Sequence, residues 1–387
     1  MVEEGYLLPE LLRVAETTTP VESVDVIVDA VRRHFAAEAV SFLILDLTGK
    51  VVVRLATAEQ EWSGREAEAV DLPGSVYEQV LRTQRLLQQS TGGGVRVISP
   101  VTNRGDAIGL LEMTLPTAPE GRVLQAVGDA SRALAYNVIA NERFTDLFTW
   151  GRRTTRPVVL PAEIQHRLLP PSLSCEASQF SLTSALEPAA TISGDTFDYN
   201  LDRETLHLSV TDPMGHDLNA ALISTILMGA LRGARRAGAD IAEQARLADQ
   251  ALVVLGAGYA TGQLLRINLH DGGTQLVNAG HPWPLRVRAG KVEEVSLAVD
   301  EPFGLPFPHS YEVQNLDLRP GDRLVMLTDG MLERRAEGVD LAAVLRGCHD
   351  LHPRETAQVL TTAVLRACDG PLEDDATVMV LDWHGTG

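Results

Sequence analysis

Short β-type runs crowd the C-terminal half of this chain, and the helical segments among them occur in pairs. β-branched and other apolar residues dominate runs such as TLHLSVTD, QLLRINL, DRLVMLTD and ATVMVLDW. The paired helical segments lie at 217–236 and 240–254, and again at 339–348 and 354–368. Strict alternation of strand and helix would predict a parallel sheet. This grouping instead predicts an α+β fold in which helices flank an antiparallel β-sandwich.

The N-terminal part of the chain has a different order of elements. Residues 7–36 show apolar residues at helical spacing, interrupted at Thr19-Pro20. A further helix candidate opens at Pro73-Gly74-Ser75, between β-type runs at 39–46, 51–57, 94–101 and 107–115. We expect a small α/β domain over residues 1–118.

A long helical stretch follows from about residue 119 to residue 150. Its residues alternate at spacings of three and four, as on the a/d seam of a coiled coil: Leu124, Val127, Ser131, Leu134, Val138, Asn141, Thr145 and Phe148. The pattern fits a signalling coiled coil in a homodimer or one helix packed on its own domain. RRTTRPVV at 152–159 is typical of a hinge, so we assign 119–159 to a signalling helix and hinge.

The third segment, residues 160–387, begins with LPAEIQHRLLPP. Its apolar residues Ile164, Leu168 and Leu169 lie on one face of a short helix that Pro170-Pro171 ends. This helix is either an ordinary packed linker or a switch that acts on the strands beyond it.

The composition of the chain excludes some classes of binding partner. The net charge is −19, with 33 basic and 52 acidic residues, so nucleic acid and anionic membrane are not expected partners. The three cysteines show no metal or disulfide spacing. The start, MVEEGYLLPELLRV, lacks the basic region of a signal peptide, and no stretch reaches 18 uninterrupted apolar residues. We expect a soluble cytoplasmic protein.

Aspartates stand in turns beside four β-type runs of the third segment. They are Asp195 in ISGD, Asp212 in SVTDPMG, Asp329 in VMLTDG, and Asp374 and Asp375 in EDDATVMV. One such aspartate is usually a turn residue, but strand ends of one sandwich converge on one edge. Converging carboxylates need a counter-charge, and no lysine or arginine lies within these motifs. Hard oxygen ligands select Mg²⁺ or Mn²⁺, so we expect a divalent-cation site.

At these residues the sequence resembles the metal-dependent serine/threonine protein phosphatases (PPM family), in the bacterial branch of the stage II sporulation and stress-response phosphatases. The resemblance covers about 160–384 and includes, in the family's order, LLPP, SGDTFDY, TDPMGHDLNAALI, YATGQLLRINL, VNAGHPWPL, FGLPF, LRPGDRLVMLTDGMLE and DDATVMVL. It implies an α-β-β-α sandwich that hydrolyses phosphoserine or phosphothreonine with two Mn²⁺ or Mg²⁺ ions.

The resemblance also implies roles for individual residues. Asp195, Asp212, Asp329 and Asp374 match the family's metal aspartates, with Asp375 as an adjacent alternative and Asp198 at a frequent acidic position. Pro213 stands where a glycine usually lends its carbonyl to the metal; proline keeps that carbonyl. Asp217 replaces a second usual glycine.

The resemblance has three further implications: for the general acid, for the phosphate-binding residue and for the N-terminal sensor domain. His216 and His281 are candidates for a general acid, although each is more often a turn residue. The phosphate-binding arginine of the eukaryotic branch has no counterpart in FSLTSALEPAA. The N-terminal domain resembles GAF sensor domains, which implies a small-molecule or protein signal there, unless its pocket is a filled core.

The resembling family implies a substrate of the anti-sigma-factor antagonist type. Two other interpretations remain. Pro213 and Asp217 are also compatible with a catalytically degenerate fold that acts as a binding module. A nucleotide cyclase would use paired aspartates as well, but TDG, DDAT and the lack of a P-loop or GGDEF-like run argue against it.

Overall fold

The computed structural model describes residues 7–46, 49–55, 68–145, 148, 159–189, 194–256, 258–332, 338–368 and 372–385. The chain forms two compact units, Met1–Pro157 and Val158–Gly387. None of the helices within these described ranges combines the length and the apolar character needed to cross a bilayer.

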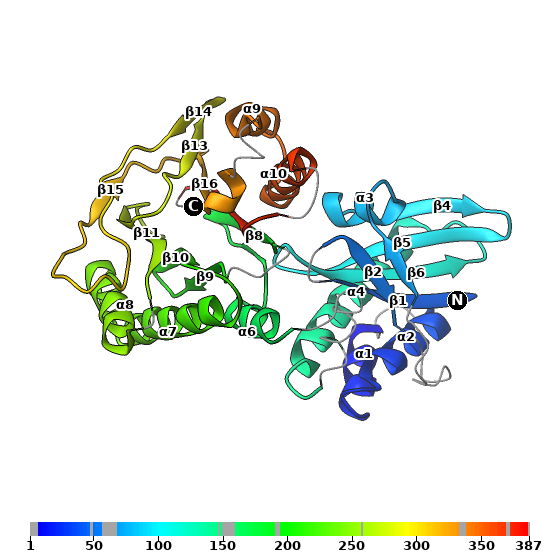
Figure 1. Ribbon diagram of the computed structural model, residues 1–387. Coiled ribbons are helices and arrows are strands. Elements are labelled where there is room, and N and C mark those ends of the chain that lie inside the picture. Colours follow the sequence, from blue (N-terminus) through cyan, green and yellow to red (C-terminus); the bar gives the residue numbers. More distant parts are fainter. Residues whose placement is uncertain are drawn as a thin grey trace. The chain divides into compact units, whose positions relative to one another are not determined.

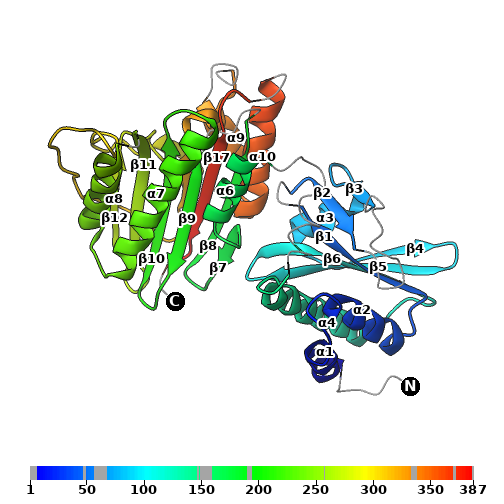
Figure 2. The same cartoon turned by 60° about the horizontal axis from the view of Figure 1, so that its bottom comes forward.

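The first unit is one antiparallel sheet covered by helices on both faces (Figures 1 and 2). The strand order is β3-β2-β1-β6-β5-β4. Its elements are α1 (Leu7–Glu16), α2 (Ser23–His34), β1 (Ala39–Leu45), β2 (Val51–Arg54), β3 (Ala69–Asp71), α3 (Val76–Thr83), β4 (Leu87–Thr91), β5 (Gly94–Asn103), β6 (Asp106–Leu115) and α4 (Gly121–Asn141). The expected small α/β domain is therefore present, and its identity as a GAF domain stays a prediction.

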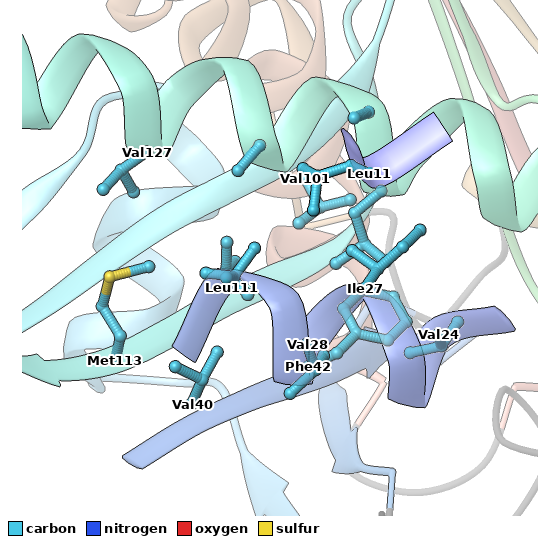
Figure 3. Packing of buried hydrophobic residues seen from close by; sticks show 14 of the residues in the cluster. Leu11, Val24, Ile27, Val28, Val40, Phe42, Val101, Leu111, Met113 and Val127 are labelled. Carbon is cyan, nitrogen blue, oxygen red and sulfur yellow. The ribbon is translucent and has the colours of Figure 1, made fainter. Parts of the chain in front are cut away.

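The core of the first unit lies between the sheet and α1, α2 and α4. Figure 3 shows Leu11 and Ile27 of the helices against Phe42 and Leu111 of the sheet. The opposite face carries α3, whose Tyr77, Val80 and Leu81 pack on strand residues such as Leu43, Val52, Ile98 and Leu110. Both faces of the sheet are thus buried by the unit's own helices.

The a/d seam of α4 belongs to this core, which corrects the coiled-coil interpretation. Val127, Leu134 and Val138 are fully buried against α1, α2 and the sheet, and Leu124 packs at the edge of the same cluster. The buried Ser131 hydroxyl donates a hydrogen bond to Ser99 on β5 (2.8 Å). The seam residues pack within one chain, so they supply no basis for a homodimer. The hinge residues 152–158 lie outside the described residues.

The second unit is a sandwich of two antiparallel sheets, with strand orders β15-β12-β11-β10-β9 and β14-β13-β16-β17-β8-β7. Its strands are β7 (Ser174–Glu176), β8 (Phe180–Glu187), β9 (Thr196–Leu201), β10 (Thr205–Pro213), β11 (Ala260–Asn268), β12 (Thr274–Ala279), β13 (Leu285–Arg288), β14 (Lys291–Glu294), β15 (Gln314–Leu316), β16 (Arg323–Leu327) and β17 (Ala376–Trp383). Apolar side chains of both sheets, including Phe180, Phe197, Leu265 and Trp383, fill the space between them.

Helices cover both outer faces of the sandwich (Figure 2). These are α6 (Leu160–Leu168), α7 (Asp217–Arg236) and α8 (Ile241–Leu255) on one side, and α9 (Leu341–Gly347) and α10 (Pro353–Ala367) on the other. A short 3-10 turn, η1 (Asp329–Leu332), follows β16. The predicted α-β-β-α sandwich is confirmed, and the helix pairs fall within two residues of the predicted bounds.

Candidate metal centre

Asp195 lies directly before β9 and is fully buried in the second unit. Thr328 and Thr377 each donate a hydroxyl hydrogen bond of 2.7 Å to its Oδ2 atom. The preceding Gly194 has φ +92°, and a Cβ atom there would press against Pro213 and the following helix. The SGD motif therefore needs its glycine for backbone conformation and close packing.

The other oxygen of Asp195 is an orphaned acceptor. Oδ1 is buried and has no hydrogen-bond partner within the described ranges. Burial, and then the carboxylates of Asp212 and Asp375, raise the pKa of Asp195 well above its ordinary value. A buried acceptor without a donor is costly, and a cation facing it would remove that cost.

Asp212 lies at the end of β10, the neighbour of β9 in the sheet. Burial raises its pKa to about 8, and the carboxylates of Asp329, Asp374 and Asp375 add to the rise. Every electrostatic cause of this shift is a negative charge, so no basic side chain among the described residues offsets Asp212. The four strand-end aspartates that the sequence singles out therefore meet at one edge of the sandwich.

Asp329 and Asp374 come from the second sheet, just after β16 and just before β17. Burial raises the pKa of Asp329, and the Asp374 carboxylate raises it further. The two turns touch at Gly330, because a Cβ atom there would collide with the carbonyl oxygen of Asp375. The TDG motif needs its glycine for this close approach.

Asp375 is engaged by protein donors. Its Oδ1 accepts a hydrogen bond from the Ala189 amide (2.8 Å), and its Oδ2 accepts from the Gly194 amide (3.0 Å). The Gln165 side chain adds a third bond to Oδ2 (2.6 Å). These bonds tie Asp375 to Ala189, Gly194 and the Gln165 side chain. They make Asp375 a positioning residue and favour Asp374 as the metal ligand of this motif.

Asp198, at a frequent acidic position of the family motif, pairs with arginines of α7. It is buried on β9 and accepts hydrogen bonds from Arg232 (2.9 Å) and Arg235 (3.0 Å) of α7. Two guanidinium groups already neutralise this carboxylate. At this frequent acidic position of the family motif, the chain therefore has a carboxylate that is already paired with two arginines.

Asp217 and Pro213, which stand where the family usually has glycine, have different backbone conformations. Asp217 opens α7 with φ +61°, a left-handed conformation that favours glycine and that aspartate tolerates better than most residues. Pro213 ends β10 opposite Ala260, with ordinary strand pairing. The backbone conformation at position 217 therefore accounts for the family's usual glycine there. At position 213 the strand backbone accommodates proline.

The two histidines have unlike environments. His216 is exposed beside Asp217, with 2.9 Å between Nδ1 and Oδ2. His281 is buried, and this burial lowers its pKa to about 4. An imidazole that is neutral at physiological pH cannot donate a proton as imidazolium, which speaks against His281 as the general acid.

Gln165 is the residue that sequence reasoning missed. It is the buried residue of α6, and its Nε2 donates to the Asp195 carbonyl (2.9 Å) as well as to Asp375. The apolar residues Ile164, Leu168 and Leu169 are only half-buried. A single glutamine in an amphipathic helix gives no sequence signal for this contact, because its partners lie 30 and 210 residues away.

The donor set fits hydrated hard cations. Within the described ranges, no three His, Cys, Asp or Glu side chains are gathered closely enough to enclose one ion by themselves. Mg²⁺ usually keeps several waters and binds through one or two carboxylates, so a closed cage is not required. The orphaned Asp195 Oδ1 and the raised pKa of Asp212 are what such ions would relieve.

Comparison with known proteins agrees with the sequence resemblance. Residues 202–384 match the family model described as stage II sporulation protein E (SpoIIE). The stage II sporulation protein E of Bacillus subtilis strain 168 is 28% identical over 197 residues, which are 49% of this chain and 24% of that protein. The chain thus spans about a quarter of the length of this curated relative.

Many solved structures are similar to the chain, including one from Bacillus subtilis and one from Mycobacterium tuberculosis. A structure of the PP2C phosphatase domain and a regulatory fragment of SpoIIE from Bacillus subtilis has 17% identity and a TM-score of 0.49, with 79% of this chain and 83% of that chain covered. The RsbU and RsbW domains of a Mycobacterium tuberculosis protein have 23% identity and a TM-score of 0.49, with 56% and 63% covered.

Proposed function

We propose that this chain is a metal-dependent protein phosphatase that hydrolyses phosphoserine or phosphothreonine, a proposal supported by the match of residues 202–384 to the SpoIIE family model. The observation that carries the proposal is the orphaned Oδ1 of Asp195, buried among carboxylates at the edge of the sandwich. Such an arrangement is unfavourable while the carboxylates are charged, and cations at this edge would stabilise the charged form.

Asp195, Asp212, Asp329 and Asp374 would hold two Mn²⁺ or Mg²⁺ ions, with the Pro213 carbonyl as a backbone ligand. When bound, two such ions supply a hydroxide nucleophile and stabilise the charge of an in-line displacement at phosphorus. Thr328 and Thr377 hold the carboxylate of Asp195 through Oδ2, and among the described residues Oδ1 has no hydrogen-bond donor.

The proposed mechanism needs no covalent intermediate on a cysteine. The three cysteines are buried free thiols; Cys368 packs in the core between the sheet and α9/α10, and Cys175 packs in the core between the two sheets. Direct attack by metal-activated water therefore accounts for hydrolysis without a phosphoenzyme.

The substrate and the control of the enzyme are further parts of the proposal. The family resemblance implies a phosphorylated anti-sigma-factor antagonist as substrate, and the GAF-like first unit implies regulation by a small molecule or a protein. A homodimer remains an expectation, now without the α4 seam as its basis.

Replacing the central carboxylates tests the proposed function. We expect Asp195→Asn and Asp329→Asn each to abolish Mn²⁺-dependent phosphate release from a phosphoserine protein, because each removes a metal-binding charge. Circular dichroism should show that both variants stay folded. The matched control is Asp350→Asn, whose side chain is 86% exposed and which should keep full activity. Near-wild-type turnover in either site variant would refute the metal assignment.

A second candidate is a catalytically degenerate fold that serves as a binding module. The observation in its favour is the strained Asp217, together with Pro213, where the family usually has glycines. Phosphate release by the full chain in Mn²⁺ separates the two candidates. Mn²⁺ binding without any turnover on phosphoserine or phosphothreonine proteins would favour the binding module.

A further inference from the structure

His281, in the AGHP motif after β12, is a buried histidine that the proposed function leaves unused. Its backbone is held from both sides by Asn278, which accepts from the His281 amide (2.8 Å) and donates to its carbonyl (2.9 Å). Gln263 of β11 donates to the next carbonyl, that of Pro282 (2.6 Å). These three bonds fix where the imidazole ring can point.

The ring meets a hydroxyl at one nitrogen only. Nδ1 lies 2.9 Å from Oγ1 of Thr261 on β11, whereas Nε2 is buried without a hydrogen-bond partner within the described ranges. Burial lowers the pKa of His281 to about 4, and the Leu327 carbonyl opposes this shift in part. The ring is therefore a neutral imidazole at physiological pH.

Thr261 contacts the His281 ring and lies beside Asp212 of the candidate metal centre. It stands directly opposite Asp212 in the β10–β11 ladder. Residues directly opposite each other in antiparallel strands place their side chains on the same face, with Cβ atoms about 5 Å apart. On this face lie Leu208 and Leu265, which belong to the core between the sheets. The Thr261 hydroxyl and the Asp212 carboxylate are therefore neighbours at the inner edge of the sandwich.

We propose that His281 is a positioning residue for the metal centre: through its Nδ1 bond it holds the Thr261 hydroxyl in one orientation beside Asp212. The proposal rests on the proposed function, because it assigns the metal to Asp212. A fixed neighbour keeps the carboxylate in the orientation in which it binds the ion. Loss of such supporting contacts typically costs tenfold to a hundredfold in metal affinity.

Two substitutions of His281 separate hydrogen bonding from packing. His281→Asn keeps a polar atom close to the place of Nδ1 but loses most of the ring, whereas His281→Phe keeps a ring without the bond. We expect His281→Phe to weaken Mn²⁺ binding by about tenfold or more, and His281→Asn to stay near the wild-type affinity. If the residue only fills space, His281→Asn should be the more damaging change.

Thr261→Val provides the matching change on the other side of the bond. It removes the hydroxyl at nearly constant volume, and we expect the same loss of Mn²⁺ affinity as in His281→Phe. The double variant should bind no more weakly than either single variant, because both remove one interaction. Additive losses would overturn the proposal.

The quantity to measure is the Kd of the full chain for Mn²⁺. It is obtained from the electron paramagnetic resonance signal of free Mn²⁺ during a titration. Melting curves show whether each variant is folded. If the wild-type chain binds no Mn²⁺, the proposed function fails, and this inference fails with it. If the wild type binds Mn²⁺ and folded His281→Phe and Thr261→Val bind it equally well, only this inference is overturned.

Discussion

Asp217, the first residue of α7, has a left-handed backbone conformation, which is strained for a residue with a side chain. Its φ of +61° suits glycine, and a side chain with a Cβ atom costs about 1–2 kcal/mol there. Aspartate reduces that cost because its short polar side chain can hydrogen-bond locally. The position is therefore one where a substitution can separate backbone strain from chemistry.

We predict that Asp217→Gly is at least as stable as the wild type, and that Asp217→Ala is less stable than Asp217→Gly by about 1 kcal/mol. Urea denaturation of the two variants side by side measures this difference. Equal stability of the alanine and glycine variants would show that the left-handed conformation is not kept in solution.

The buried carboxylate of Asp212 makes the metal-free protein sensitive to pH. Its pKa is raised to about 8 in the folded protein, against about 4 for an unfolded aspartate. Between these values the folded state binds more protons than the unfolded state, so stability falls as the pH rises. The stabilising contribution is complete below pH 4 and is lost as the pH passes 8.

We expect the melting temperature of EDTA-treated protein to fall between pH 5.5 and pH 8.5. Asp212→Asn should flatten much of this slope, because the amide carries no charge, whereas Asp350→Asn should keep it. Added Mn²⁺ should raise the melting temperature most at the alkaline end. A melting temperature that rises across this range would contradict the prediction.

Among the helices, α6 contacts the candidate metal centre through hydrogen bonds. Gln165 bonds the Asp195 carbonyl and the Asp375 carboxylate, and Arg232 of α7 donates to the Leu168 carbonyl at the end of the helix (2.6 Å) while binding Asp198. A shift of α6 would therefore break bonds to the strands that carry the site. This supports the switch hypothesis, with a packed linker helix as the alternative.

We predict that Leu168→Ala changes the phosphatase rate or the Mn²⁺ requirement by far more than its change in melting temperature explains. Leu168 packs against the α7–α8 cluster, so its truncation lets α6 move. The control is Leu365→Ala, which truncates a leucine of similar burial on α10. If both variants lose activity only in proportion to lost folded protein, α6 is packing and not a switch.

At the scale of the whole molecule, the a/d seam of α4 packs inside the first unit. Leu134 is fully buried in the core of the first unit. We predict that Leu134→Ala lowers the free energy of unfolding of this unit by about 2–5 kcal/mol, independently of protein concentration. Melting curves over a hundredfold concentration range test this. A destabilisation that disappears at high concentration would restore the seam as a dimer interface.

The sequence determined the elements and the candidate ligands of the second unit. Apolar periodicity and grouped helices predicted the sandwich, because burial on one face sets the spacing of apolar residues. Asp195, Asp212 and Asp329 could be selected because aspartates in turns at converging strand ends, without basic neighbours, are unusual. These signals are local, so one sequence is enough to find them.

Only the tertiary structure decided which groups meet. The a/d pattern of α4 has the same spacing whether its partner is a second chain or the unit's own sheet, and packing chose the sheet. Asp198 is separated from its arginines by more than 30 residues, and Gln165 from Asp375 by 210. Charge neutralisation and hydrogen bonding depend on distance in space, which local patterns do not encode. Folding therefore determined which described carboxylates meet arginines, as Asp198 does, and which lie beside other carboxylates, as Asp212 does.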